Sequence, residues 1–96
     1  MKGYWIIVGT EVIDPEAQQE YGRLWKPIAE QYGAVLKTLG TEALRELKGG
    51  SRVIVVEFPS YAQAVACYED PAYIEAKRFA LRASTRELVI VEGDLS

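Results

Sequence analysis

The chain has no histidine and only one cysteine, Cys67, among its 96 residues. Without histidine, Ser-His-Asp and Cys-His nucleophile arrangements, histidine-ligated haem and histidine-containing zinc sites are excluded. A single cysteine excludes an internal disulfide, a thiolate metal site and a Cys-x-x-Cys redox pair. Glycine-rich phosphate-binding loops of the Gly-x-Gly-x-x-Gly or Walker type are also missing. Any catalysis therefore depends on carboxylates, tyrosines, arginines, lysines or the thiol, and we expect no metal and no cofactor.

An excess of positive charge and long apolar runs are missing too. The net charge is −3, and the basic residues Arg78, Arg82 and Arg86 are balanced by acids elsewhere, which disfavours nucleic acid as a partner. No apolar run approaches the ~20 residues that span a bilayer, so no membrane is expected. The chain enters a predicted strand almost at once, so we expect no signal peptide and a cytoplasmic location.

Three stretches of the chain are apolar on both faces: residues 4–8, 53–58 and 88–91. A strand with one face in water alternates apolar and polar residues, and these stretches do not. The centre of the sheet should therefore be buried on both sides. The helices available from 96 residues can cover about one face. We predict that a second copy of the chain covers the other, giving a homodimer.

Helix boundaries are marked by short local signals. Asp14-Pro15 and Asp70-Pro71 each combine an N-cap with proline at the first helical position, and Ser60 with Gln63 forms a capping box. Gly33 is a C-cap signal for the first helix. Pro27 should kink that helix or break it near Trp25.

These signals predict one domain, residues 1–96, of the α+β class. The expected strands are 4–12, 34–39, 52–58 and 86–92, and the expected helices are 14–33 and 60–83, the second split at Asp70. Lys37 favours an edge position for the second strand. Residues 41–48 are ambiguous between helix and extended structure, and we favour extended structure. The order β-α-β-β-α-β is the ferredoxin-like pattern, an antiparallel sheet with its helices on one face.

Several segments in this order resemble the DUF1330 family over nearly the whole chain. They are Gly3-Tyr4-Trp5-Ile6, Glu57-Phe58-Pro59-Ser60, Tyr68 with Asp70-Pro71-Ala72-Tyr73, Leu81-Arg82, and Val91-Glu92-Gly93. The resemblance implies a dimeric α+β barrel, in which two ferredoxin-like sheets pack face to face. Related barrel families include cofactor-free monooxygenases, lactone isomerases and haem enzymes, together with members of no known reaction. This chain lacks the histidine that the haem-binding relatives use as a ligand.

Glu57 is the first candidate for chemistry. It lies near the end of an otherwise apolar strand, in phase with Val53 and Val55. Burial would raise its pKa and suit it to act as a general acid or base. The alternatives are that the strand has reached solvent at Glu57, or that Glu57 forms a structural ion pair.

Arg78 and Arg82 lie four residues apart and so share a helix face. Their guanidinium groups suit a carboxylate or enolate oxygen. Arg82, at the family-like Leu-Arg position, is the second catalytic candidate, and Arg78 is a ligand-binding candidate. The alternative is a solvated helix face or ion pairs with nearby acids.

Tyr21, Trp25 and Tyr68 lie on the inward stripes of the predicted helices and are candidates for lining a ligand pocket. Aromatic stripes at helical spacing also fill ordinary cores. Trp25 is favoured as a pocket residue because it precedes Pro27.

Two functions follow. One is a cofactor-independent small-molecule enzyme, an isomerase or monooxygenase-like protein that abstracts a proton, with Glu57 and Arg82 in a pocket between sheet and helices. The other is a non-catalytic ligand-binding or structural homodimer. A cavity beneath Trp25 and Tyr68, with Glu57 or Arg82 in its wall, distinguishes them.

Overall fold

A computed structural model describes residues 1–39 and 52–93 of the chain. Its elements are β1 (Lys2–Gly9), α1 (Pro15–Tyr32), β2 (Val35–Leu39), β3 (Arg52–Phe58), α2 (Tyr61–Glu69), α3 (Pro71–Ala83) and β4 (Arg86–Gly93). The prediction for residues 41–48 lies outside the described residues. Elsewhere the order is the predicted one.

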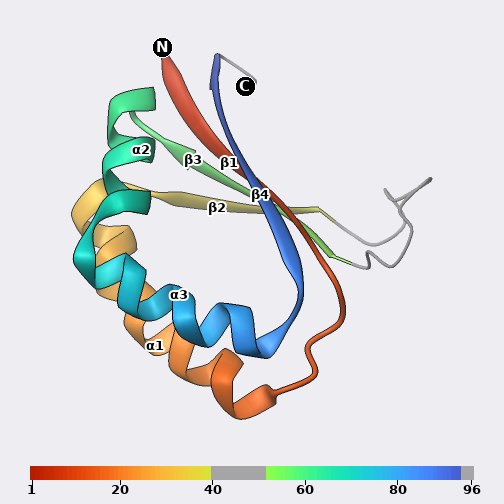
Figure 1. Cartoon of the computed structure of the whole chain (residues 1–96). Coiled ribbons are helices and arrows are strands. Elements are labelled where there is room, and N and C mark those ends of the chain that lie inside the picture. Colours follow the sequence, from red (N-terminus) through yellow and green to blue (C-terminus); the bar gives the residue numbers. More distant parts are fainter. Residues whose placement is uncertain (40–51, 94–96) are drawn as a thin grey trace.

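The four strands form one antiparallel sheet in the order β2-β3-β1-β4. All three helices cover the same face of this sheet (Figure 1). The ferredoxin-like α+β fold is thereby confirmed, with the two least polar strands, β1 and β3, at the centre. Lys37 lies on β2, an edge strand, as predicted.

The helix boundaries follow their sequence signals. Asp14 accepts a hydrogen bond from the backbone N–H of Ala17, and Ser60 accepts one from Gln63. Gly33 ends α1 with φ of 65°, the left-handed conformation that glycine adopts without steric cost.

One residue joins all three helices at one end. Asp70 is the C-cap of α2 and the N-cap of α3, where its carboxylate accepts a hydrogen bond from the backbone N–H of Ala72. The other carboxylate oxygen accepts a hydrogen bond of 2.5 Å from the hydroxyl of Tyr32, the last residue of α1.

Two boundaries differ from those expected. α1 continues through Pro27, so the expected break near Trp25 does not occur, while a kink there stays a prediction. Trp25 and Ile28 pack against the core on either side of the proline, and this packing outweighs the lost backbone hydrogen bond. β1 ends at Gly9 rather than at residue 12, because the backbone N–H groups of Thr10 and Ile13 bond to the carbonyls of Thr85, which follows α3, and Ala83, its last residue.

The register of β1 decides which side chains meet the helices. Trp5 is fully buried on the helix side, and its indole N–H donates a 2.9 Å hydrogen bond to the carbonyl of Ala64. Its ring contacts those of Phe58, Tyr68 and Tyr73 at centroid distances of 5.0, 5.8 and 4.8 Å. This aromatic cluster is the centre of the core.

None of the helices in residues 1–39 and 52–93 covers the other face of the sheet. Ile6 is paired with Val55 on one side and with Val89 on the other, and all three point away from the helices. Val89 remains 55% exposed. We call this surface the outer face. Its centre is apolar, as the sequence predicted, and Glu57 and Lys37 lie on the same face nearer its edge.

Candidate functional site

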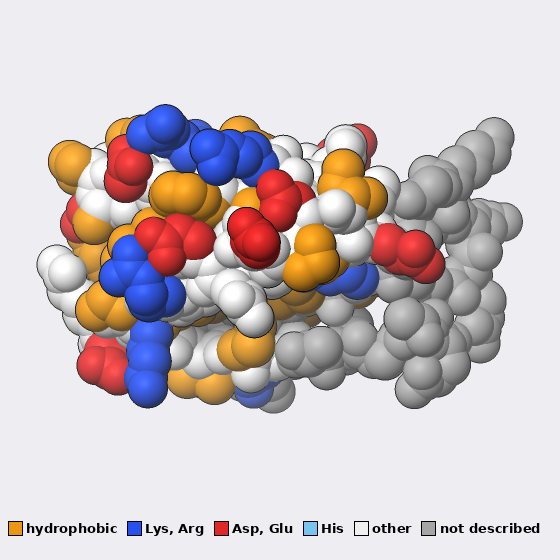
Figure 2. Space-filling model, turned by 90° about the horizontal axis from the view of Figure 1, so that it is seen from below, with side chains coloured by type: hydrophobic (Ala, Val, Ile, Leu, Met, Phe, Trp, Pro, Cys, Tyr) orange, Lys and Arg blue, Asp and Glu red, His pale blue; other side chains and the backbone are white. Residues whose placement is uncertain are grey.

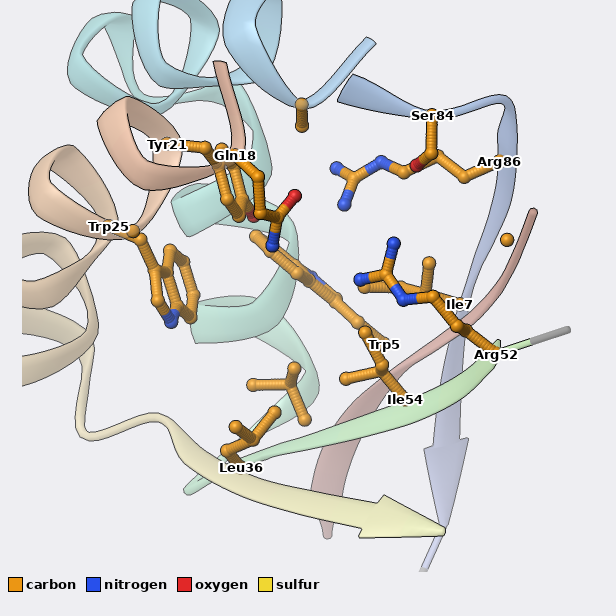
Figure 3. A pocket seen from close by; sticks show the side chains of 14 residues that line it. Trp5, Ile7, Gln18, Tyr21, Trp25, Leu36, Arg52, Ile54, Ser84 and Arg86 are labelled. Atoms are coloured by element: carbon orange, nitrogen blue, oxygen red, sulfur yellow. The ribbon is translucent and has the colours of Figure 1, made fainter. Parts of the chain in front are cut away.

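A pocket of about 170 Å³ lies between the helix side of the sheet and helices α1 and α3. Its floor is formed by Trp5, Ile7 and Ile54 from the central strands. Figure 3 shows Tyr21 and Trp25 projecting from α1 towards this floor. The pocket is therefore the space that remains where the apolar faces of the sheet and of α1 do not pack tightly against each other.

Strand register gives the pocket an apolar end and a cationic end. Trp5 and Ile7 lie between apolar residues of β3 and β4 on the helix side. Two residues further along β1, Gly9 is paired with Arg52 on one side and with Arg86 on the other. Since Gly9 has no side chain, the space between the two arginines stays open, and Figure 3 shows both guanidinium groups directed into the pocket.

Arg86 is held by two tyrosines. It donates a 2.5 Å hydrogen bond to the hydroxyl of Tyr73, which lies 3.1 Å from the hydroxyl of Tyr21. The guanidinium carbon of Arg86 lies 5.4 Å from the centre of the Tyr21 ring, a cation–π contact. These contacts fix the direction of the Arg86 side chain at the cationic end.

The electrostatics of this end favour one protonation state. Burial raises the pKa of Tyr73, and the nearby Tyr21 raises it further, so Tyr73 stays neutral. Burial by itself lowers the pKa of Arg86, but Tyr73 and Tyr21 outweigh that effect and the net shift is upward. Arg86 is therefore a cation beside the neutral hydroxyl of Tyr73.

The remaining polar lining consists of Gln18 from α1 and Ser84, which is the C-cap of α3. Within residues 1–39 and 52–93, no carboxylate lines the pocket. The same ranges hold no group of three His, Cys, Asp or Glu side chains arranged for a metal ion. What the arrangement can do chemically is bind an apolar group at one end and a negative charge at the other.

The sequence matches the family described as "Domain of unknown function (DUF1330)" over residues 2–94. The chain belongs to the DUF1330 family. No curated protein matches it.

Solved structures share the fold of this DUF1330 chain. The RPA0582 protein of unknown function from Rhodopseudomonas palustris is 22% identical, with a TM-score of 0.71 over 99% of this chain and 84% of that chain. SnoaB, a cofactor-independent oxygenase from Streptomyces nogalater, is 16% identical, with a TM-score of 0.69 over 99% and 95% of the two chains. A dimeric ferredoxin-like protein of unknown function from Bacteroides fragilis is 9% identical, with a TM-score of 0.61 over 96% of each chain.

The pocket of this DUF1330 protein includes two of the residues singled out from the sequence, Tyr21 and Trp25. Tyr68 is not among the lining residues: it packs edge-on against Trp5 in the core, with its ring 4.7 Å from the ammonium group of Lys77.

The two arginines predicted on α3 lie outside the pocket. Arg78 is exposed and pairs with Glu75 at 3.0 Å. Arg82 is exposed and lies over the ring of Phe79 at 5.2 Å. The inward stripe of α3 is instead made of Tyr73, Ala76, Ala80 and Ala83.

Glu57 lies on the outer face, paired with Tyr4 across the strands, and so cannot contribute to the pocket wall. Its carboxylate lies 3.3 Å from the ammonium group of Lys2 and 3.5 Å from that of Lys37. Burial favours a raised pKa for Glu57, but Lys2 and Lys37 outweigh burial, and the pKa is lowered instead. The cavity was expected beneath Trp25 and Tyr68. The pocket is lined by Trp25 but not by Tyr68, and neither Glu57 nor Arg82 is in its wall.

Sequence reasoning missed Arg52 and Arg86, the residues that give the pocket its charge. Each begins a strand, where a charged residue ordinarily meets solvent. The signal that could have found them is the alternation of side chains along a strand. Arg52 is in phase with Ile54 and Val56, and Arg86 is in phase with Leu88 and Ile90, so each arginine shares a face with apolar residues. Placing them together also required the pairing of both strands with Gly9.

One face of the molecule is mixed in charge. Figure 2 views the molecule from below, and basic and acidic side chains lie interspersed on that face. None of the helices in the described ranges combines the length and apolar character that crossing a membrane requires.

Proposed function

We propose that this DUF1330 protein is a single-domain homodimer that binds a small, mainly apolar organic molecule in the pocket of each subunit. The observation that carries the proposal is the cavity of about 170 Å³ next to a tightly packed aromatic core. Protein interiors contain few voids larger than a water molecule. An apolar cavity with a few convergent polar groups is the usual form of a ligand site.

The outer face supports the dimer. Ile6, Val55 and Val89 form an apolar surface without a helix over it, a condition that an antiparallel sheet normally avoids by packing. The dimeric protein from Bacteroides fragilis shares this fold. Two outer faces packed together would enclose a barrel across the dimer and bury the Glu57 ion pairs. The buried, unpaired thiol of Cys67 supports a reducing, cytoplasmic location.

A catalytic role is the second candidate function. The observation in its favour is the Arg86 cation, hydrogen-bonded to a buried hydroxyl at the end of an apolar pocket. Such a group stabilises negative charge that develops on a substrate oxygen. In this version Arg86 takes the role first suggested for Arg82. The similarity to the cofactor-independent oxygenase SnoaB also supports it, at the level of the fold.

The binding proposal is tested with toluene, a neutral ligand of one ring. The chain has two tryptophans, Trp5 and Trp25, and both line the pocket, so intrinsic fluorescence reports occupancy directly. We expect a saturable change in the wild-type protein. Ala80→Leu, which fills the pocket from α3, should abolish it. Ala66→Leu, on the exposed side of α2, should bind as the wild type does. No saturation, or equal binding by Ala80→Leu, would overturn the proposal.

The dimer is tested by light scattering after size exclusion. The expected mass is twice 10.7 kDa. Ile6→Asp places a charge on the outer face and should give an unstable or aggregating monomer. Arg78→Asp changes an exposed helix residue and serves as the control. A stable, soluble monomer in the wild type, or an Ile6→Asp dimer as tight as the wild type, would contradict this assembly.

A further inference from the structure

We infer that the ligand is an organic anion built on a single aromatic ring, with its acidic group between Arg52 and Arg86 and its ring against Trp5 and Trp25. This inference rests on the proposed binding function and specifies its chemistry. Four observations carry it: the position of the two arginines, the charge around them, the volume of the pocket and its aromatic lining.

The position of the arginines follows from the sheet. Arg52 and Arg86 are both paired with Gly9 and lie on the same face, so their backbones are two strand spacings, about 10 Å, apart. Both side chains enter the pocket (Figure 3). A Cβ atom on Gly9 would lie 3.4 Å from the Cβ of Arg86, so a larger side chain there would crowd this space. The glycine thus leaves a gap between two guanidinium groups.

Nothing in residues 1–39 and 52–93 balances the positive charge on the two sides of this gap. In the part of the chain that the structure describes, no carboxylate pairs with Arg52 or Arg86. The hydrogen-bond partner of Arg86 is the neutral hydroxyl of Tyr73. Two like charges that face one pocket repel each other, and desolvated charges normally require a counter-charge. A carboxylate between them supplies that charge, and the planar guanidinium group is suited to bind it.

The volume limits the rest of the ligand. An engineered apolar cavity of about 150 Å³ holds benzene. The pocket here, of about 170 Å³, is close to that size, so we expect one ring with a small acidic group to fill it better than two fused rings do.

The lining favours an aromatic ring over an aliphatic chain. The rings of Trp5 and Trp25 lie 5.4 Å apart and tilted by 37°, and Tyr21 is stacked on Trp25. A flat ring can contact these π faces in offset or edge-on geometry. Ile54 and Ile7 complete an apolar floor beneath it.

The test is a fluorescence titration of the wild-type protein with four probes: benzoate, benzamide, 2-naphthoate and inorganic phosphate. Benzamide has nearly the shape of benzoate without the charge. We expect benzoate to bind about tenfold or more tightly than benzamide. We also expect 2-naphthoate and phosphate to bind more weakly than benzoate.

Two variants locate the acidic group. Arg86→Gln and Arg52→Gln should each weaken benzoate binding about tenfold and weaken benzamide binding by much less, so that the preference for the anion shrinks. Arg78→Gln, an exposed arginine outside the pocket, should bind both probes as the wild type does. Arg52 makes no hydrogen bond to the core that the structure records, so its variant tests the site even if Arg86→Gln fails to fold.

Each failure has a distinct meaning. Equal affinity for benzoate and benzamide overturns the anionic ligand, while toluene binding would leave the proposed pocket intact. Tighter binding of 2-naphthoate overturns the limit of one ring. Phosphate binding as tight as benzoate binding overturns the aromatic component. If neither toluene nor benzoate binds, the proposed function itself fails.

Discussion

Tyr73→Phe removes one oxygen atom from the cationic end of the pocket and should lower the free energy of unfolding by about 2 kcal/mol. The Tyr73 hydroxyl accepts a 2.5 Å hydrogen bond from Arg86 and lies 3.1 Å from the Tyr21 hydroxyl. Hydrogen bonds to charged groups contribute about 1.5–3 kcal/mol each, and a partner left unpaired raises the cost of losing one. The ring of Tyr73 is fully buried against Trp5, so phenylalanine keeps the packing and loses only the polar contacts.

Thermal unfolding at a fixed protein concentration measures this effect. For a chain of this length, a loss of about 2 kcal/mol corresponds to a fall of about 10 °C in Tm. Tyr61→Phe is the matched control, because the Tyr61 side chain is 39% exposed and should change stability by less than about 0.5 kcal/mol. If Tyr73→Phe unfolds at the same temperature as Tyr61→Phe, Arg86 does not depend on the hydroxyl, and the reasoning about this end of the pocket is refuted.

Three further predictions concern the fold. Gly3→Ala should destabilise the protein by about 1–3 kcal/mol in urea unfolding, because the new methyl would lie 2.6 Å from the backbone of α2. Gly22→Ala, whose methyl meets open space on α1, should instead stabilise by about 0.5–1 kcal/mol; similar losses in both would contradict the packing described. The hydrogen bond from Tyr32 lowers the folded-state pKa of Asp70, so its contribution to stability is present above the ordinary value of 3.8 and is lost as the pH falls through the lowered pKa. In Asp70→Asn the free energy of unfolding should therefore fall less steeply as the pH is lowered through the acidic range. An unchanged dependence on pH would count against the hydrogen bond between Tyr32 and Asp70. Burial raises the pKa of Cys67 to about 12, so a disulfide reagent at pH 8 should modify the native thiol about a hundredfold or more slowly than the unfolded one; equal rates would show that the thiol is accessible.

Most of the fold was predictable because its signals are local. Asp14-Pro15 and Asp70-Pro71 both start helices where the sequence placed them, since N-cap geometry depends on only a few neighbouring residues. The unbroken apolar strands identified the centre of the sheet because burial on both faces leaves no polar alternation. The break that Pro27 allowed does not occur, because tertiary packing that the local sequence does not reveal outweighs the lost hydrogen bond.

The site was less predictable because it depends on which way one strand faces. The sequence shows that Tyr4 and Trp5 point to opposite faces, but not which of them meets the helices. Once Trp5 is placed on the helix side, Glu57 follows onto the outer face and Arg52 into the pocket. Placing Tyr4 instead of Trp5 on the helix side would move every side chain of β3 to the opposite face of the sheet.

The way Asp70 links the helices has a mechanical consequence. A single carboxylate ends α2, begins α3 and ties down the last residue of α1. Asp70 thus links the three helices at one corner of the molecule. Gln18, which lines the pocket, lies near the other end of α1. If α1 moves away from the sheet, we expect it to rotate about the end that is bonded to Asp70. The displacement of α1 would then be smallest beside Tyr32, and at the other end of the helix the hydrogen bond from Ile13 to Ala83 limits it.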